Sequence, residues 1–299
     1  MDIIHSLEKQ KMRFYCSYHV LLLFGFSFFL PAEGSDPWNQ FRGPNGSGIR
    51  ADASIGVPSV DDLRWKTLLP FGLSCPVLSK DKIFLTGIDN KHLLTIALER
   101  ESGKVLWKKK APKTEIEKFH PSSSPVTPTP FVEEKRLYIY FGSYGLICYD
   151  HQGLEIWKKP LPTPRSLYGT ASSPLVHENL LIQVIDDDAH MPNSQVSRSR
   201  ILALDKESGE IIWERFRPFH RSGWSTPTIW EHGSSRELVV LGNGSLRGYS
   251  LPDGEETWQV DGFSRETIAR PVTGKGKVYA SGSSLGGAAR LQTDPPPSR

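Results

Sequence analysis

The sequence predicts an all-β protein built from successive four-stranded sheets, the blades of a β-propeller. Three observations lead to this prediction. A motif consisting of a strand, a glycine, three residues and a tryptophan recurs along the chain. A proline-led segment separates successive copies. The tryptophans follow one another at steps of 42, 50, 56 and 45 residues, which suits one four-stranded blade per step.

The glycine–tryptophan motif has a physical explanation. Glycine supplies the positive φ that closes a tight hairpin between the third and fourth strands of a blade. The tryptophan then lies in the outermost strand, where its large ring can be buried against the neighbouring blade. An earlier, partial copy ends at Trp65. The complete copies are Gly103–Trp107, Gly153–Trp157, Gly209–Trp213 and Gly254–Trp258.

The proline-led segments are predicted to open the first strand of each blade. A proline at the start of a strand costs no hydrogen bond of the sheet. A β-sandwich with coincidental glycine–tryptophan spacing is the alternative, but four copies in register favour the propeller. The five prolines are Pro76, Pro125, Pro174, Pro227 and Pro271.

The first 34 residues have the three parts of a signal peptide. Basic residues precede an apolar stretch from Val20 to Leu30, and small residues follow at Ala32 and Gly34. The stretch is shorter than the roughly 20 residues that a membrane-spanning helix needs. We therefore expect a periplasmic or secreted protein with no stable membrane span after cleavage; an uncleaved anchor is the alternative.

The remaining chain divides into an opening segment at residues 35–60, propeller repeats at 61–292 and an unstructured tail at 293–299. The net charge is +3, and positive and negative residues alternate instead of forming a basic patch. This distribution argues against nucleic acid as a partner. Cys75 and Cys148 show no spacing typical of a disulfide or a metal site.

The repeats resemble those of the pyrroloquinoline-quinone-like, or quinoprotein-like, family. Residues 203–213 closely match the family's docking motif, residues 97–107 differ from it at one position, and residues 38–48 resemble its opening. The resemblance implies a quinoprotein-like β-propeller, typically of seven or eight blades. This chain provides four complete blades and part of a fifth, from Thr267 to about Gln292. We expect a C-terminally truncated chain, or an incomplete ring that another chain completes.

The resemblance also raises the alternative of an enzyme, a pyrroloquinoline-quinone-dependent alcohol or sugar dehydrogenase with calcium. Such enzymes hold the quinone near acidic and amide ligands of the ion. The candidate ligands here are Asp186, Asp187 and Asp188, near His190 and Asn193. A solvated loop is the competing interpretation, and no adjacent cysteine pair occurs. We expect no cofactor and name no catalytic residue.

Two loops are candidates for a ligand surface. Arg165 and Tyr168 lie on one, and Arg221 and Trp224 lie on the other; both precede proline-led strands. Their mixture of cations and aromatic rings is typical of binding surfaces, although packing at the strand start is the alternative. The preferred hypothesis is therefore an exported, non-catalytic binding or scaffold module for a protein or glycan partner.

Overall fold

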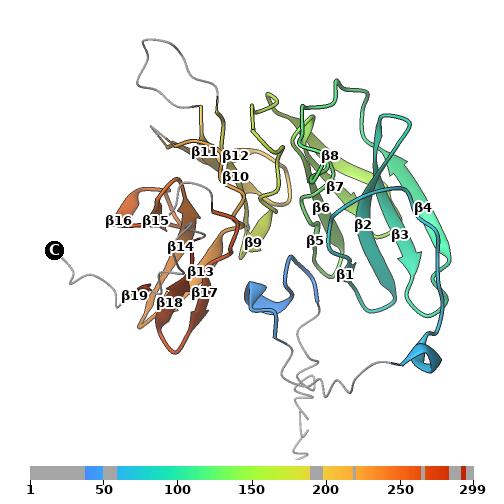
Figure 1. Ribbon diagram of the computed structural model, residues 1–299, viewed down its shortest axis with the longest axis horizontal. Coiled ribbons are helices and arrows are strands. Elements are labelled where there is room, and N and C mark those ends of the chain that lie inside the picture. The colour runs from blue at the N-terminus through green and yellow to red at the C-terminus, as the bar shows by residue number, and fades with distance from the viewer. Residues whose placement is uncertain are drawn as a thin grey trace, which may run out of the picture. The chain divides into compact units, whose positions relative to one another are not determined.

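The computed structural model describes residues 38–49, 59–188, 198–217, 220–263, 267–282 and 291–293. Within these ranges the chain forms four sheets of four antiparallel strands and one sheet of three, in sequence order (Figure 1). Each sheet is one blade, which confirms the predicted propeller fold. The predicted signal peptide and residues 294–299 of the predicted tail lie outside the described residues.

The strands of each blade pair with their neighbours in chain order. Blade 1 consists of β1 (Val77–Leu78), β2 (Lys82–Asp89), β3 (His92–Glu99) and β4 (Val105–Lys110). Blade 2 consists of β5 (Phe131–Val132), β6 (Arg136–Phe141), β7 (Gly145–Asp150) and β8 (Glu155–Pro160). Blade 3 consists of β9 (Leu175–His177), β10 (Leu180–Ile185), β11 (Arg200–Asp205) and β12 (Ile211–Phe216).

Blade 4 consists of β13 (Thr228–His232), β14 (Ser235–Gly242), β15 (Ser245–Ser250) and β16 (Glu256–Asp261). Blade 5 consists of β17 (Val272–Gly274), β18 (Lys277–Ala280) and β19 (Leu291–Thr293). β19 therefore ends one residue beyond the predicted end of the repeats. Two short 3-10 helices, η1 (Pro44–Gly46) and η2 (Val60–Asp62), precede the blades.

The burial of the strands follows their place in the blade. The middle strands β6 and β10 are buried along almost their whole length, because neighbouring blades cover both of their faces. The fourth strands β4, β8 and β16 alternate between exposed and partly buried residues, since one of their faces meets solvent. No helix in the described part of the chain is long and apolar enough to cross a membrane.

Four of the five docking tryptophans pack on the glycine of the following copy. A Cβ added to Gly153 would lie only 3.0 Å from the ring of Trp107, whose indole nitrogen donates to the backbone oxygen of His151 at 3.1 Å. The hairpin glycines have φ between 70° and 80°, as predicted. The four stacked pairs are Trp65–Gly103, Trp107–Gly153, Trp157–Gly209 and Trp213–Gly254.

Trp258 has different surroundings from the other docking tryptophans. Its indole nitrogen donates to the side chain of Glu237 in its own blade at 3.0 Å, and its ring meets Trp230 edge-on at 5.9 Å. Among the described residues, no glycine of a following copy packs on the Trp258 ring.

A ladder of hydroxyl groups joins the blades near their first strands. The residue before the opening proline donates its backbone N–H to the hydroxyl of the equivalent residue in the next blade. The three bonds run from Cys75 to Thr129 (3.0 Å), from Thr129 to Ser173 (2.9 Å) and from Ser173 to Thr226 (3.1 Å). Blades 1 to 4 are thus joined at two places, by hydroxyls near the first strands and by tryptophans at the fourth.

This ladder corrects one predicted strand start. The sequence assigned the opening proline of blade 2 to Pro125, but β5 begins after Pro130, and Thr129 before it takes the ladder position. Residues 124–127 form a turn instead, in which Ser124 accepts from the backbone of Val126 and from the Thr127 hydroxyl. Pro125 and Pro130 lie only five residues apart, so both assignments are compatible with the sequence pattern.

The opening segment contacts three blades. The backbone oxygen of Trp38 accepts from Leu78 at 2.8 Å, and that of Asn39 accepts from Val132 at 2.9 Å. The Asn45 side chain donates to the Thr273 hydroxyl at 3.1 Å. Residues 38–48 therefore connect β17 of blade 5 with β1 and β5 of blades 1 and 2.

Candidate functional site: a surface of inter-blade loops

Three loops that connect consecutive blades meet through aromatic side chains. The ring of Tyr168 lies 5.0 Å from that of His120 and meets Trp224 edge-on at 5.2 Å. The buried Trp224 donates its indole N–H to the backbone oxygen of Gly169 at 2.9 Å. The connections between blades 1 and 2, 2 and 3, and 3 and 4 therefore form one continuous surface.

The aspartates between β10 and β11 form hydrogen bonds with two of these loops. Asp187 accepts from the backbone N–H of Arg165 at 3.2 Å, and Asp188 donates its own N–H to the Arg165 oxygen at 2.7 Å. The Asp188 carboxylate accepts from the backbone of Leu167 at 3.2 Å and of Ser222 at 2.7 Å. The interpretation of Asp186 and Asp187 as a solvated loop is wrong, because both are buried.

Asp186 forms a buried ion pair with Arg217. The two side chains approach to 2.5 Å, and both are almost inaccessible to solvent. Burial raises the pKa of Asp186, while the Arg217 charge and hydrogen bond oppose that rise. Gly223 lies against this carboxylate, where a Cβ would come within 2.7 Å of it. The pair thus fixes the base of the loop that carries Arg221 and Trp224.

Glu117 links the first two of the connecting loops. Its carboxylate accepts from the Thr170 hydroxyl at 2.8 Å, and its backbone N–H donates to Ser143 at 3.0 Å. The side chain is buried, so desolvation raises the pKa of Glu117 to about 7, although the Thr170 hydrogen bonds oppose the rise. A Cβ at Gly142 would meet both Glu117 and Thr170, which shows how closely these loops approach.

The outer side of these loops exposes apolar and cationic groups together. Leu167 is 64% exposed and Phe119 is 42% exposed. His120, Arg165 and Arg221 are exposed beside them. We call these five residues and the half-buried Tyr168 the loop surface. Apolar side chains surrounded by arginine and aromatic groups are typical of the energetically important parts of protein interfaces.

The comparison with protein families gives a match to one family model. The model is described as outer membrane protein assembly factor BamB, and it matches residues 90–294, which is more than half of the chain. The chain belongs to the BamB family. No curated protein shows significant similarity to the chain.

Solved structures also resemble the chain. BamB from Moraxella catarrhalis is 16% identical, with a TM-score of 0.45, and the match covers 71% of this chain and 55% of that one. A quinohemoprotein alcohol dehydrogenase from Pseudomonas putida HK5 is 14% identical, with a TM-score of 0.49, over 77% of this chain and 40% of that one. The chain thus spans about half the length of these proteins or less, and such distant likenesses say nothing about activity.

In this BamB-family chain, protein groups contact the three aspartates that the sequence offered as candidate calcium ligands. Asp186 is paired with Arg217, and protein donors contact the carboxylates of Asp187 and Asp188. Across the described ranges, no group of three or more histidine, cysteine or acidic side chains has a geometry suited to a metal ion. His190 and Asn193, which the sequence grouped with the aspartates, lie outside the described residues.

The structure brings together all four residues predicted to form a ligand surface. Arg165 and Tyr168 lie on one loop, Arg221 and Trp224 on the next, and Asp188 lies between the loops and approaches Arg221 at 3.8 Å. Trp224 is buried and supports the surface instead of facing a ligand. Sequence reasoning missed Glu117, Phe119, His120, Leu167 and Arg217, because their roles depend on contacts between distant loops.

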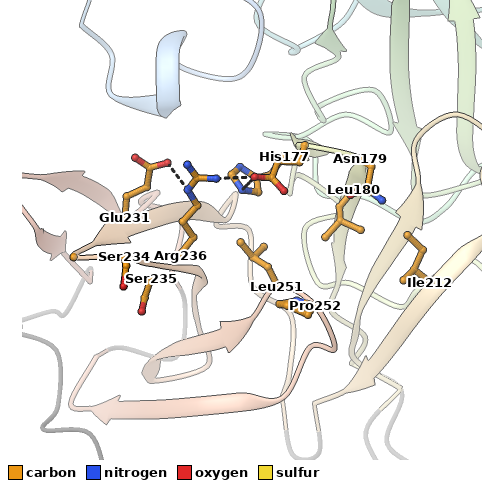
Figure 2. Close-up of a pocket in the computed structure, with 12 residues that line it drawn as sticks. His177, Asn179, Leu180, Ile212, Glu231, Ser234, Ser235, Arg236, Leu251 and Pro252 are labelled. Atoms are coloured by element: carbon orange, nitrogen blue, oxygen red, sulfur yellow. Dashed lines mark hydrogen bonds and ion pairs between the residues drawn. The ribbon is translucent and has the colours of Figure 1, made fainter. Parts of the chain in front are cut away.

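A hollow lies at the end of the strands opposite to the loop surface. A cavity of about 570 Å³ opens at the β9–β10 and β13–β14 turns and is lined by His177, Leu251 and neighbouring residues (Figure 2). Arg236 crosses it and pairs with Glu178 at 2.6 Å and with Glu231 at 3.2 Å. Because these charges neutralise one another, the loop surface is the stronger candidate for function.

Proposed function

We propose that this BamB-family propeller is a non-catalytic binding module that docks a protein partner through the loop surface. The observation that carries the proposal is the exposed group of Phe119, Leu167, Arg165 and Arg221 above a buried, hydrogen-bonded base. The family's description suggests a partner in outer membrane protein assembly, and hence an exported protein acting in the periplasm.

The base of the surface favours binding because it reduces the entropy lost on association. A loop that is already ordered loses less freedom when a partner immobilises it. The Asp187 and Asp188 bonds fix the backbone at Arg165 and Leu167, while Trp224 supports Tyr168. The exposed side chains are then presented in one arrangement, as a docking surface requires.

The charge of the surface indicates the chemistry of the partner. Arg165 and Arg221 are both exposed, and the nearby Asp188 is the acidic group that partly offsets them. A partner segment with acidic residues beside aliphatic or aromatic ones would complement the surface. The proposed function requires no quinone or metal ion.

Site-specific photo-crosslinking in the periplasm tests the proposal. A photoreactive residue at Leu167 should give one discrete crosslinked protein species. The matched control is Leu154, which is 65% exposed, against 64% for Leu167, but lies in the β7–β8 hairpin. Crosslinking at Leu154 with none at Leu167 would show that the partner binds elsewhere.

Two variants would extend the crosslinking test. Arg165→Glu and Arg221→Glu should each weaken the Leu167 crosslink by reversing a charge of the surface, without a change in the thermal midpoint. An unchanged crosslink in both variants would contradict the proposed role of the arginines.

A further inference from the structure

Arg270 breaks the hydroxyl ladder of the blades. It directly precedes Pro271 and β17, so it takes the position that Thr129, Ser173 and Thr226 take in the earlier blades. A long cation therefore stands where three blades have a small hydroxyl. Its side chain does not extend the ladder but reaches the opening segment instead.

The guanidinium of Arg270 is oriented by two acceptors on one side only. Its Nη1 donates to the side-chain oxygen of Gln40 at 3.2 Å and to the backbone oxygen of Phe41 at 2.9 Å. Nε and Nη2 are buried and have no hydrogen-bond partner. Those two nitrogens form the edge from which arginine binds two oxygens of one carboxylate or phosphate.

No carboxylate among the described residues compensates the Arg270 charge. The side chain is only 6% exposed, and burying an unpaired cation is costly. Burial, followed by the nearby Arg42 charge, lowers the pKa of Arg270 to about 9. Within the described part of the chain, Arg270 and Arg42 therefore form a local excess of positive charge.

The opening segment packs closely against this guanidinium. A Cβ at Gly46 would lie 2.0 Å from the guanidinium carbon, so the absence of a side chain lets the segment approach it. Gly43, Gly46 and Asn45 all have positive φ, which gives residues 42–48 a tightly turned backbone.

We propose that Arg270, assisted by Arg42, binds an oxyanion of the carboxylate or phosphate type between the opening segment and the start of blade 5. The free edge of the guanidinium provides two parallel donors for two oxygens of the ligand. The anion source is either a small free molecule or an acidic side chain of a partner. The site is separate from the loop surface, so it stands whether or not the proposed partner binds there.

Thermal melts of the full chain test the proposal. Midpoints are measured in chloride, phosphate and acetate at equal ionic strength. Phosphate or acetate should raise the midpoint saturably by a few degrees, because a ligand bound only to the folded state stabilises it. Half-saturation below about 1 mM would indicate a free anion, whereas a much weaker effect would indicate a carboxylate that a partner presents. No saturable shift with either anion would overturn the proposal.

Variants then assign the effect to Arg270. Arg270→Gln should abolish the anion-induced shift, and Arg42→Gln should reduce it. Arg236→Gln, at an arginine already paired with Glu178 and Glu231, should leave the shift unchanged. An unchanged shift in Arg270→Gln would overturn the assignment. If that variant fails to fold, the wild-type titrations and Arg42→Gln still decide.

Discussion

Replacing Gly209 with alanine should weaken the contact between blades 2 and 3. Gly209 has φ of 73°, and a Cβ there would lie 2.7 Å from two atoms of the Trp157 ring. Real Cβ atoms do not approach carbon so closely, so the ring or the hairpin must move. Trp157 also donates to the backbone oxygen of Lys206 at 3.0 Å, and that bond is expected to weaken as the ring shifts.

Two costs combine in this substitution. A non-glycine residue with a left-handed backbone costs about 1–2 kcal/mol. Forcing an extra methyl group into a packed contact costs about 1–3 kcal/mol more. We therefore expect Gly209→Ala to lower the free energy of unfolding by about 3 kcal/mol.

Gly233→Ala is the matched control for the backbone cost alone. Its φ is 56°, and a Cβ there would meet nothing within 4 Å. Urea unfolding followed by circular dichroism should show a loss of only about 1 kcal/mol for this variant. In a Trp157→Ala background, Gly209→Ala should cost no more than the control, since the clash is removed. Equal costs for Gly209→Ala and Gly233→Ala in the wild-type background would refute this account.

Three further predictions concern the loops and the cofactor. The pKa of Glu117 lies above that of an exposed carboxyl, so the folded state keeps this proton to a higher pH than the unfolded state. The free energy of unfolding should therefore fall as the pH rises from 4.5 to about 7. Glu117→Gln should remove most of this pH dependence in urea titrations. Asp186→Ala should cost about 3–5 kcal/mol by leaving Arg217 buried and unpaired, and Arg217→Met should restore much of the loss. Pyrroloquinoline quinone with Ca²⁺ should leave the thermal midpoint unchanged; an upward shift would favour the dehydrogenase alternative.

The repeat was sufficient to predict the fold, because the residues of its motif act close to one another along the chain. Gly209 closes a hairpin of its own blade, and Trp213 follows it at a fixed distance in the next strand, so both functions appear as a short spacing. Pro125 shows the limit of such patterns. Pro130 fits the strand start equally well in the sequence, and only the bond from Cys75 to Thr129 in the next blade distinguishes them.

The loop surface was predictable in part. The cations and rings of Arg165, Tyr168, Arg221 and Trp224 are visible in the sequence, and they do lie together. The burial of Asp186 is not visible there, because its partner Arg217 is distant along the chain and a run of three aspartates is typical of solvated loops. Which charges are paired depends on how loops from different blades meet, and a single sequence does not contain that information.

The two kinds of contact between blades point in the same direction along the chain. Trp107 of blade 1 needs the hairpin of blade 2, and the amide of Cys75 needs the hydroxyl of Thr129, also in blade 2. During synthesis, each of blades 1 to 3 therefore leaves the ribosome with an indole that is not yet covered and an amide that lacks its hydroxyl acceptor, because the following blade provides both partners. The contacts of each of these blades are therefore complete only after the next blade has been translated. Until then its uncovered surface can associate with other chains.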